Sequence, residues 1–80
     1  MTDAEVLATV AEIARIHLTW SGTLRPEMRL VEDLRLDSLS RLTLAIEIED
    51  HFRIRLDDED ESGIETVADL VAAIRSRLAA

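Results

Sequence analysis

The chain has 80 residues, 48% hydrophobic and 32% charged, which predicts one small globular domain over residues 1–80 and argues against disorder. Its net charge is −8, with nine Arg, no Lys and 17 acidic residues, which argues against a nucleic-acid binder and favours partners that present Arg and Lys. The absence of Cys excludes disulfides, thiolate metal sites and cysteine nucleophiles.

The first predicted element is a helix from about Thr2 to Leu18. Thr2 and Glu5 form a T-x-x-E capping box, which satisfies unpaired N–H groups at a helix start. An apolar stripe follows at helical spacing, in line with Val6, Val10, Ile13 and His17. Few aromatic residues and many Ala and Leu favour an all-helical core.

Residues 20–36 form a long segment without regular periodicity, because Gly22 and Pro26 interrupt it. The segment still carries many apolar side chains: Leu24, Met28, Leu30, Leu34 and Leu36. We therefore expect a loop packed down over the core rather than a flexible one. Loops of this length are unusual in a compact domain and often have a function.

A second helix is predicted from Asp37, a good N-cap residue, to about Phe52. It carries apolar residues on two sides. One side contains Leu44, Ile48 and Phe52, and the other contains Leu39 and Ile46, bordered by Glu47, Glu49 and Asp50. Such a helix is either central in the fold or keeps one apolar strip for a partner.

Two further helices are predicted in the last third of the chain. The acidic run 57–61 indicates a short helical turn only weakly. Thr66 and Asp69 repeat the capping-box pattern, and an apolar stripe then runs through Val67, Leu70, Val71, Ile74 and Leu78. The sequence therefore predicts an all-α fold with three longer helices, one short helix and a long first loop.

Ser38 is the most informative candidate for a functional residue. Asp37 caps the second helix, so Ser38 lies in its first turn with the hydroxyl exposed. A phosphodiester built on this hydroxyl would lie near unpaired N–H groups and the positive end of the helix dipole. On the local pattern alone, a helix-start serine without further function is the commoner explanation.

In residues 30–39 (LVEDLRLDSL) and 46–52 (IEIEDHF), the sequence resembles the acyl carrier protein family, which includes peptidyl and aryl carrier domains. The match continues in the acidic turn from Asp57 and in the helix after Thr66. The three-letter D-S-L core is weak by itself. It becomes specific after E-D-L, at the head of an acidic helix in an acidic chain of this length.

The resemblance implies a four-helix bundle that acts as a non-catalytic carrier. Ser38 would receive 4′-phosphopantetheine from coenzyme A through a separate phosphopantetheinyl transferase. The thiol of the arm would hold acyl or aminoacyl groups as thioesters in fatty-acid, polyketide or related biosynthesis. Further expected partners are loading ligases or transferases and ketosynthases with basic docking surfaces.

The sequence departs from the family pattern at two positions. Arg35 stands where the family usually has Gly, and Thr43 where it often has an acid, with Arg41 adding positive charge nearby. The expected docking surface comprises Leu39, Arg41, Thr43, Ile46, Glu47, Glu49 and Asp50. An interior lined by Leu42, Leu44, Ala45, Val67 and Leu70 is expected to shelter a short acyl chain.

The sequence bears on three other functions. An unmodified acidic helical adaptor for a basic partner would use the same strip on the second helix. An imperfect calcium-loop pattern runs from Asp58 to Asp69, but no metal site is expected. A hydrolase is disfavoured, because no G-x-S-x-G motif exists and a Ser38–His51 dyad would span roughly 20 Å along the helix.

The N-terminal residues and the hydropathy of the chain predict where the protein is found in the cell. Residues 1–14 carry acids where a secretion signal would carry positive charge. No apolar run approaches the roughly 20 residues of a membrane span. We therefore expect a cytoplasmic monomer that does not insert into membranes.

Overall fold

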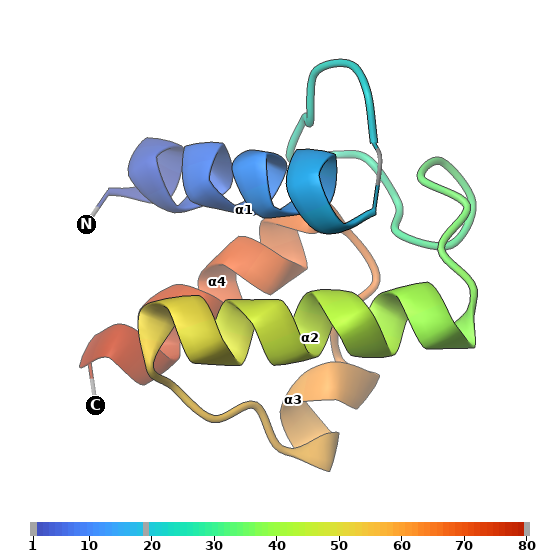
Figure 1. The fold of residues 1–80 in the computed structure, drawn as a ribbon. Helices are drawn as coiled ribbons and strands as arrows, with labels where there is room; N and C mark the ends of the chain where they lie inside the picture. Colours follow the sequence, from blue (N-terminus) through green and yellow to red (C-terminus); the bar gives the residue numbers. More distant parts are fainter. Residues whose placement is uncertain (1, 19, 80) are drawn as a thin grey trace.

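The computed structural model describes residues 2–18 and 20–79, the side chain of Asp58 excepted. These residues form four helices, α1 (Asp3–His17), α2 (Ser38–Phe52), α3 (Asp58–Ser62) and α4 (Val67–Ala79) (Figure 1). The predicted all-α fold with three longer helices, one short helix and a long first loop is confirmed. Within these residues, no helix is long and apolar enough to cross a bilayer.

One hydrophobic core lies between α1, α2 and α4. Helix α1 packs against both others, and α4 passes behind α1 and α2 in Figure 1. The most deeply buried side chains come from all three helices: Val6, Val10, Ile48, Val67 and Ile74. Because each buried side chain of this size contributes about 1.5–3 kcal/mol, this core is the main source of stability.

Short-range side-chain bonds begin each helix. The Thr2–Glu5 capping box forms, with Glu5 N–H donating to Thr2 Oγ1 at 3.2 Å. The predicted Thr66–Asp69 box forms as well, with two reciprocal bonds of 3.1 Å. A further box at α3 pairs Asp57 with Asp60. This box binds unpaired N–H groups at the start of α3, a helix that the sequence indicates only weakly.

The long loop between α1 and α2 is packed, as predicted: Leu24, Leu30 and Leu36 are buried. Its backbone is bonded to the start of α4. Leu30 N–H donates to the Glu65 carbonyl at 3.0 Å, and Val67 N–H donates to the Met28 carbonyl at 2.9 Å. Loop carbonyls thus satisfy unpaired N–H groups of α4, and the loop fixes where α2 begins relative to α4.

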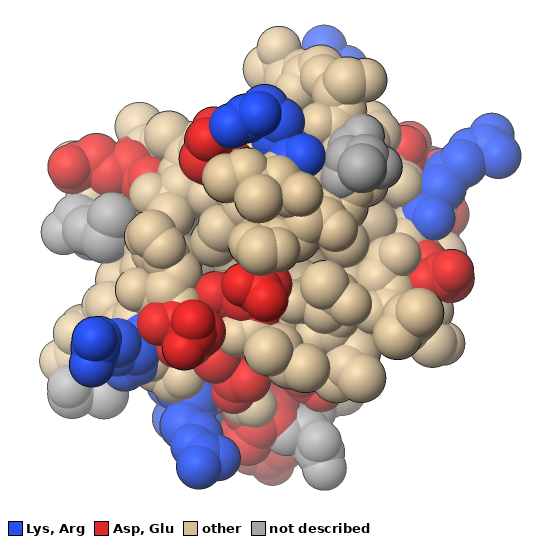
Figure 2. All heavy atoms as spheres, in the orientation of Figure 1, with Lys and Arg blue, Asp and Glu red and all other residues tan. Residues whose placement is uncertain are grey.

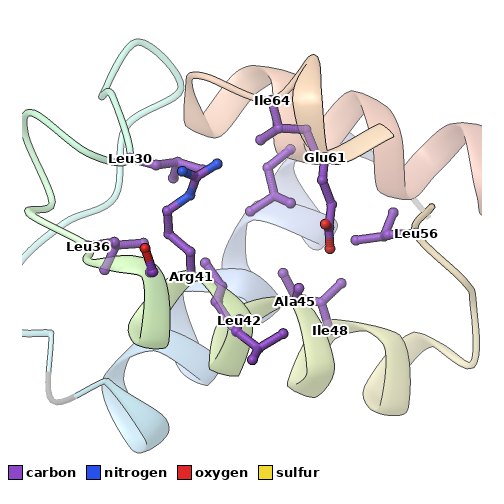
Figure 3. A pocket seen from close by; sticks show the side chains of 12 residues that line it. Leu30, Leu36, Arg41, Leu42, Ala45, Ile48, Leu56, Glu61 and Ile64 are labelled. Carbon is purple, nitrogen blue, oxygen red and sulfur yellow. The ribbon is translucent and has the colours of Figure 1, made fainter. Parts of the chain in front are cut away.

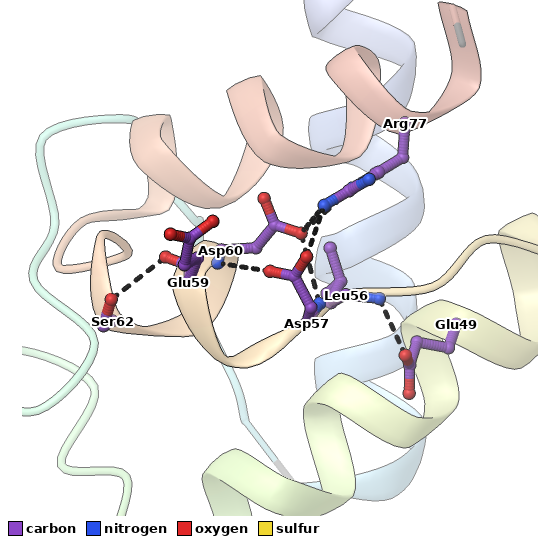
Figure 4. Close-up of polar contacts among 7 residues, drawn as sticks. All are labelled: Glu49, Leu56, Asp57, Glu59, Asp60, Ser62 and Arg77. Carbon is purple, nitrogen blue, oxygen red and sulfur yellow. Dashed lines mark hydrogen bonds and ion pairs between the residues drawn. The ribbon is translucent and has the colours of Figure 1, made fainter.

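Helix α3 is held mainly by polar contacts, since its sequence DEDES has no apolar residue. Arg77 of α4 reaches across to it (Figure 4): its Nε donates to Asp60 Oδ2 at 2.9 Å and its Nη2 to Asp57 Oδ2 at 3.0 Å. The buried Leu56 and Ile64 flank the helix. These contacts connect α3 to the rest of the bundle.

The calcium-loop pattern is not realised. Its first five residues form α3 instead of an open loop. Asp60 binds Arg77, and the Asp69 carboxylate accepts the N–H groups of Glu65 and Thr66 at 3.1 Å. These bonds hold the pKa of both Asp60 and Asp69 below its usual value. The carboxylates of Asp60 and Asp69 therefore serve the fold.

Two side chains on the apolar sides of their helices are nevertheless exposed. His17 is in line with the apolar stripe by its spacing, and it is exposed at the end of α1, with Nε2 3.3 Å from Glu47 Oε2. Leu42 borders the space between α2 and α4, as expected, but it is 55% exposed. The packing of neighbouring helices decides how far each side of a helix is covered.

Candidate functional site

Ser38 is the first residue of α2 and is exposed. Asp37 caps the helix, and its Oδ1 accepts the Ser40 N–H at 2.7 Å. This hydrogen bond lowers the pKa of Asp37 below its usual value, so the carboxylate remains charged at the positive end of the helix. No described residue forms a hydrogen bond with the Ser38 hydroxyl. The hydroxyl is therefore free to react.

A cavity of about 340 Å³ opens beside Ser38 (Figure 3). Most of its walls are apolar and come from α2, the long loop, the flanks of α3, and α4. The lining residues are Leu30, Leu36, Ser38, Arg41, Leu42, Leu44, Ala45, Ile48, Leu56, Glu61, Ile64 and Leu70. The attachment candidate thus lies on the wall of a space that suits an apolar group.

Four of the five residues expected to line an acyl-binding interior do so: Leu42, Leu44, Ala45 and Leu70. Val67 does not, because it is fully buried against the other side of the core. Arg41 and Glu61 were not expected in the cavity. Both carry long side chains that extend over an apolar wall while keeping the charge near solvent, so hydropathy alone does not identify them.

Arg35 takes the backbone conformation that explains the family's glycine at this position. Its φ is +57°, in the left-handed region that glycine adopts without steric cost. A residue with a β-carbon incurs roughly 1–2 kcal/mol there. The turn before Ser38 therefore forms in this chain despite the missing glycine, but with local strain.

Arg35→Gly is expected to raise the free energy of unfolding by about 0.5–1 kcal/mol, since relief of the steric cost exceeds the extra entropy of glycine in the unfolded chain. Urea titration followed by circular dichroism measures the change. Arg35→Ala is the control, because it removes the same charge but keeps the β-carbon. If Arg35→Gly were no more stable than Arg35→Ala, the backbone at Arg35 would not be strained.

The expected docking residues are spread over two sides of α2. Leu39 and Ile46 are exposed by 71% and 51%, and the exposed Leu42 lies between them. Arg41 and Asp50 are exposed as well, and the Thr43 hydroxyl donates to the Leu39 carbonyl at 2.9 Å. Leu39, Leu42 and Ile46 form an apolar strip. Its middle member was missed, although its spacing of three and four residues places it on the same side.

Two of the expected acidic docking residues have partners inside the chain. Glu47 faces α1, where it pairs with His17. Glu49 Oε2 accepts the Leu56 N–H at 2.8 Å and so anchors the segment after α2 (Figure 4). Acidic side chains still gather on the face that carries α1 and α2, next to a broad uncharged surface (Figure 2).

Comparison with known proteins agrees with this geometry. Residues 4–74 match the family model described as a phosphopantetheine attachment site. The meromycolate extension acyl carrier protein of Mycobacterium tuberculosis is 37% identical over 76 residues, which are 94% of this chain but only 66% of that protein. The acyl carrier protein of Rhodococcus erythropolis is 32% identical over 92% of this chain and 82% of its own length.

The fold comparison points to the same family. The crystal structure of the acyl carrier protein from Thermotoga maritima superimposes with a TM-score of 0.87 at 29% identity, over 96% of this chain and 91% of that one. The chain belongs to the acyl carrier protein family and contains its phosphopantetheine attachment domain.

Proposed function

We propose that Ser38 is the attachment point of 4′-phosphopantetheine and that the chain carries acyl groups between biosynthetic enzymes. The observation that supports this most is the exposed Ser38 hydroxyl, without a hydrogen-bond partner among the described residues, on the wall of an apolar cavity. The bound arm would supply a terminal thiol that holds the cargo as a thioester, which a chain without Cys cannot do itself.

The residues around Ser38 fit this group. Asp37 is occupied by its cap bond, so it orients the first turn of α2. The apolar walls formed by Leu44, Ile48 and Leu70 would receive a short acyl chain. The curated relatives named for meromycolate extension favour a fatty-acyl cargo from a lipid-extending pathway over an aminoacyl cargo.

The partners would be a phosphopantetheinyl transferase and the enzymes that load, extend or unload the arm. The apolar strip Leu39–Leu42–Ile46 would supply the contact area. The net charge of −8 would steer partners that present basic side chains around their active sites. We expect the carrier to act as a monomer in the cytoplasm.

Intact-mass measurement after incubation with coenzyme A and a broad-specificity phosphopantetheinyl transferase tests the attachment site. The original chain is expected to gain the mass of one arm, and Ser38→Ala is expected to gain no mass. Ser40→Ala is the matched control, because it removes a hydroxyl two residues along α2 and keeps the Ser40 N–H that Asp37 accepts. It should be modified like the original chain.

Two results would overturn the proposal. The first is an equal mass gain in Ser38→Ala, which would place the arm elsewhere. The second is no mass gain in the original chain. This result would favour an acidic adaptor that carries no arm and uses the same apolar strip.

A further inference from the structure

Arg41 shares the cavity wall with Ser38 and has no counter-ion among the described side chains. Within the described residues, five of the nine Arg side chains form ion pairs with carboxylates, but Arg41 does not. Its side chain extends from α2 toward Leu30 (Figure 3). Its guanidinium is exposed at the rim of this cavity, where it can attract a nearby anion.

The neighbouring carboxylates do not serve as that anion. The Asp37 carboxylate is used to cap α2 through the Ser40 N–H. Glu61 lies across the cavity on α3 and makes no ion pair with Arg41. The positive charge beside Ser38 is therefore available to a group that is not part of the polypeptide.

We propose that Arg41 binds the phosphodiester that would join the arm to Ser38, an inference that rests on the proposed function. Ser38 and Arg41 are three residues apart on one helix, so their side chains are neighbours. A phosphodiester keeps one negative charge, and guanidinium binds phosphate oxygens through paired hydrogen bonds. Because the phosphate would be tethered to Ser38, the contact needs no loss of translational freedom.

This contact makes Arg41 a positioning residue. It holds the first atoms of the arm on the side of α2 that faces the cavity, so that the arm starts toward the cavity instead of into solvent. Arg35 lies at the same sequence distance before Ser38 but does not line the cavity. It therefore serves as the matched comparison for charge alone.

The test measures thermal unfolding before and after the arm is attached to Ser38, a step called loading here. It compares the original chain with Arg41→Gln and Arg41→Lys. Loading is expected to raise the Tm of the original chain by about 2–6 °C more than that of Arg41→Gln, as for one partly exposed ion pair in a domain of this size. Arg41→Lys should keep most of the effect, since it retains the charge. At 0.5 M NaCl the difference should fall by about half or more.

Arg35→Gln controls for general electrostatics and should change the effect of loading by less than about 1 °C. An equal loss in Arg35→Gln and Arg41→Gln would overturn the proposal, as would no loss in Arg41→Gln. In the original chain alone, the Arg41 Nε–H signal in nitrogen NMR should shift on loading. An unchanged signal would also overturn the proposal, even if the transferase rejected the variants.

Intact mass, measured first on each sample, separates the two hypotheses. No modification of the original chain removes the proposed function and this inference together. Modification at Ser38 with the same rise in Tm in the original chain and in Arg41→Gln removes the inference alone.

Discussion

Ile48→Ala is expected to lower the free energy of unfolding by about 2–5 kcal/mol, the usual cost of deleting a buried Ile side chain. Ile48 is fully buried in the centre of α2 and also lines the cavity beside Ser38. The variant would therefore enlarge a space that already exists, which neighbouring side chains cannot easily fill. Because a small domain has only about 5–15 kcal/mol of stability, urea unfolding followed by circular dichroism should show a large shift of the midpoint.

Ile46→Ala is the matched control for this prediction. It makes the same chemical change two residues earlier on the same helix, but Ile46 is 51% exposed. Its expected effect is within about 0.5 kcal/mol. If the two variants lost similar amounts of stability, the interior position of Ile48 and the side of α2 that faces the core would both be in question.

Arg77→Gln is expected to detach α3 while the three longer helices stay folded. The five residues of α3 lack apolar side chains, and Arg77 bonds both Asp57 and Asp60. Without the guanidinium, those two carboxylates repel each other at the start of a short helix. Amide hydrogen exchange should therefore accelerate across Asp58–Ser62 and much less in α1 and α2.

The matched control is Arg75→Gln, on the same helix, whose side chain pairs with Asp3 at 2.8 Å. It should leave the exchange of α3 amides unchanged. Equal acceleration of α3 in the two variants would show that the loss of any charge from α4 is sufficient. It would contradict a specific role for Arg77.

The same cluster predicts an acid dependence. The hydrogen bond from Arg77 is the main reason why the pKa of Asp60 lies below its usual value. A carboxylate with a lowered pKa in the folded state stabilises the fold above its unfolded pKa. That contribution is lost as the pH falls through the folded value. Protection of α3 amides should therefore decline below about pH 4, and Arg77→Gln should show a smaller change over the same range.

The helix starts could be predicted from the sequence because their determinants are local. Thr2 with Glu5, and Thr66 with Asp69, are three residues apart, and both pairs form the predicted bonds. Asp37 likewise caps α2 through Ser40. The Asp57–Asp60 box has the same spacing, but the surrounding run of acids also fits a solvated segment, so its helix was only weakly indicated.

The contacts that join distant segments could not be predicted in this way. Glu47 of α2 contacts His17 of α1, and Arg77 of α4 donates a hydrogen bond to Asp60 of α3. Each pair depends on how two helices pack, whereas a helical pattern describes one helix at a time. The positive φ of Arg35 is similar, since nothing in an Arg residue indicates a left-handed backbone.

The sequence alone determined the helical class, the helix starts and the position of Ser38 at the head of α2. Periodicity, capping pairs and the D-S-L motif act over a few residues of one chain segment. Only the tertiary structure decided that Leu42 is exposed, that Glu47 turns toward α1 and that Arg41 borders a cavity with Ser38. These properties depend on which neighbour covers each side of a helix, and that follows from the packing of the whole bundle.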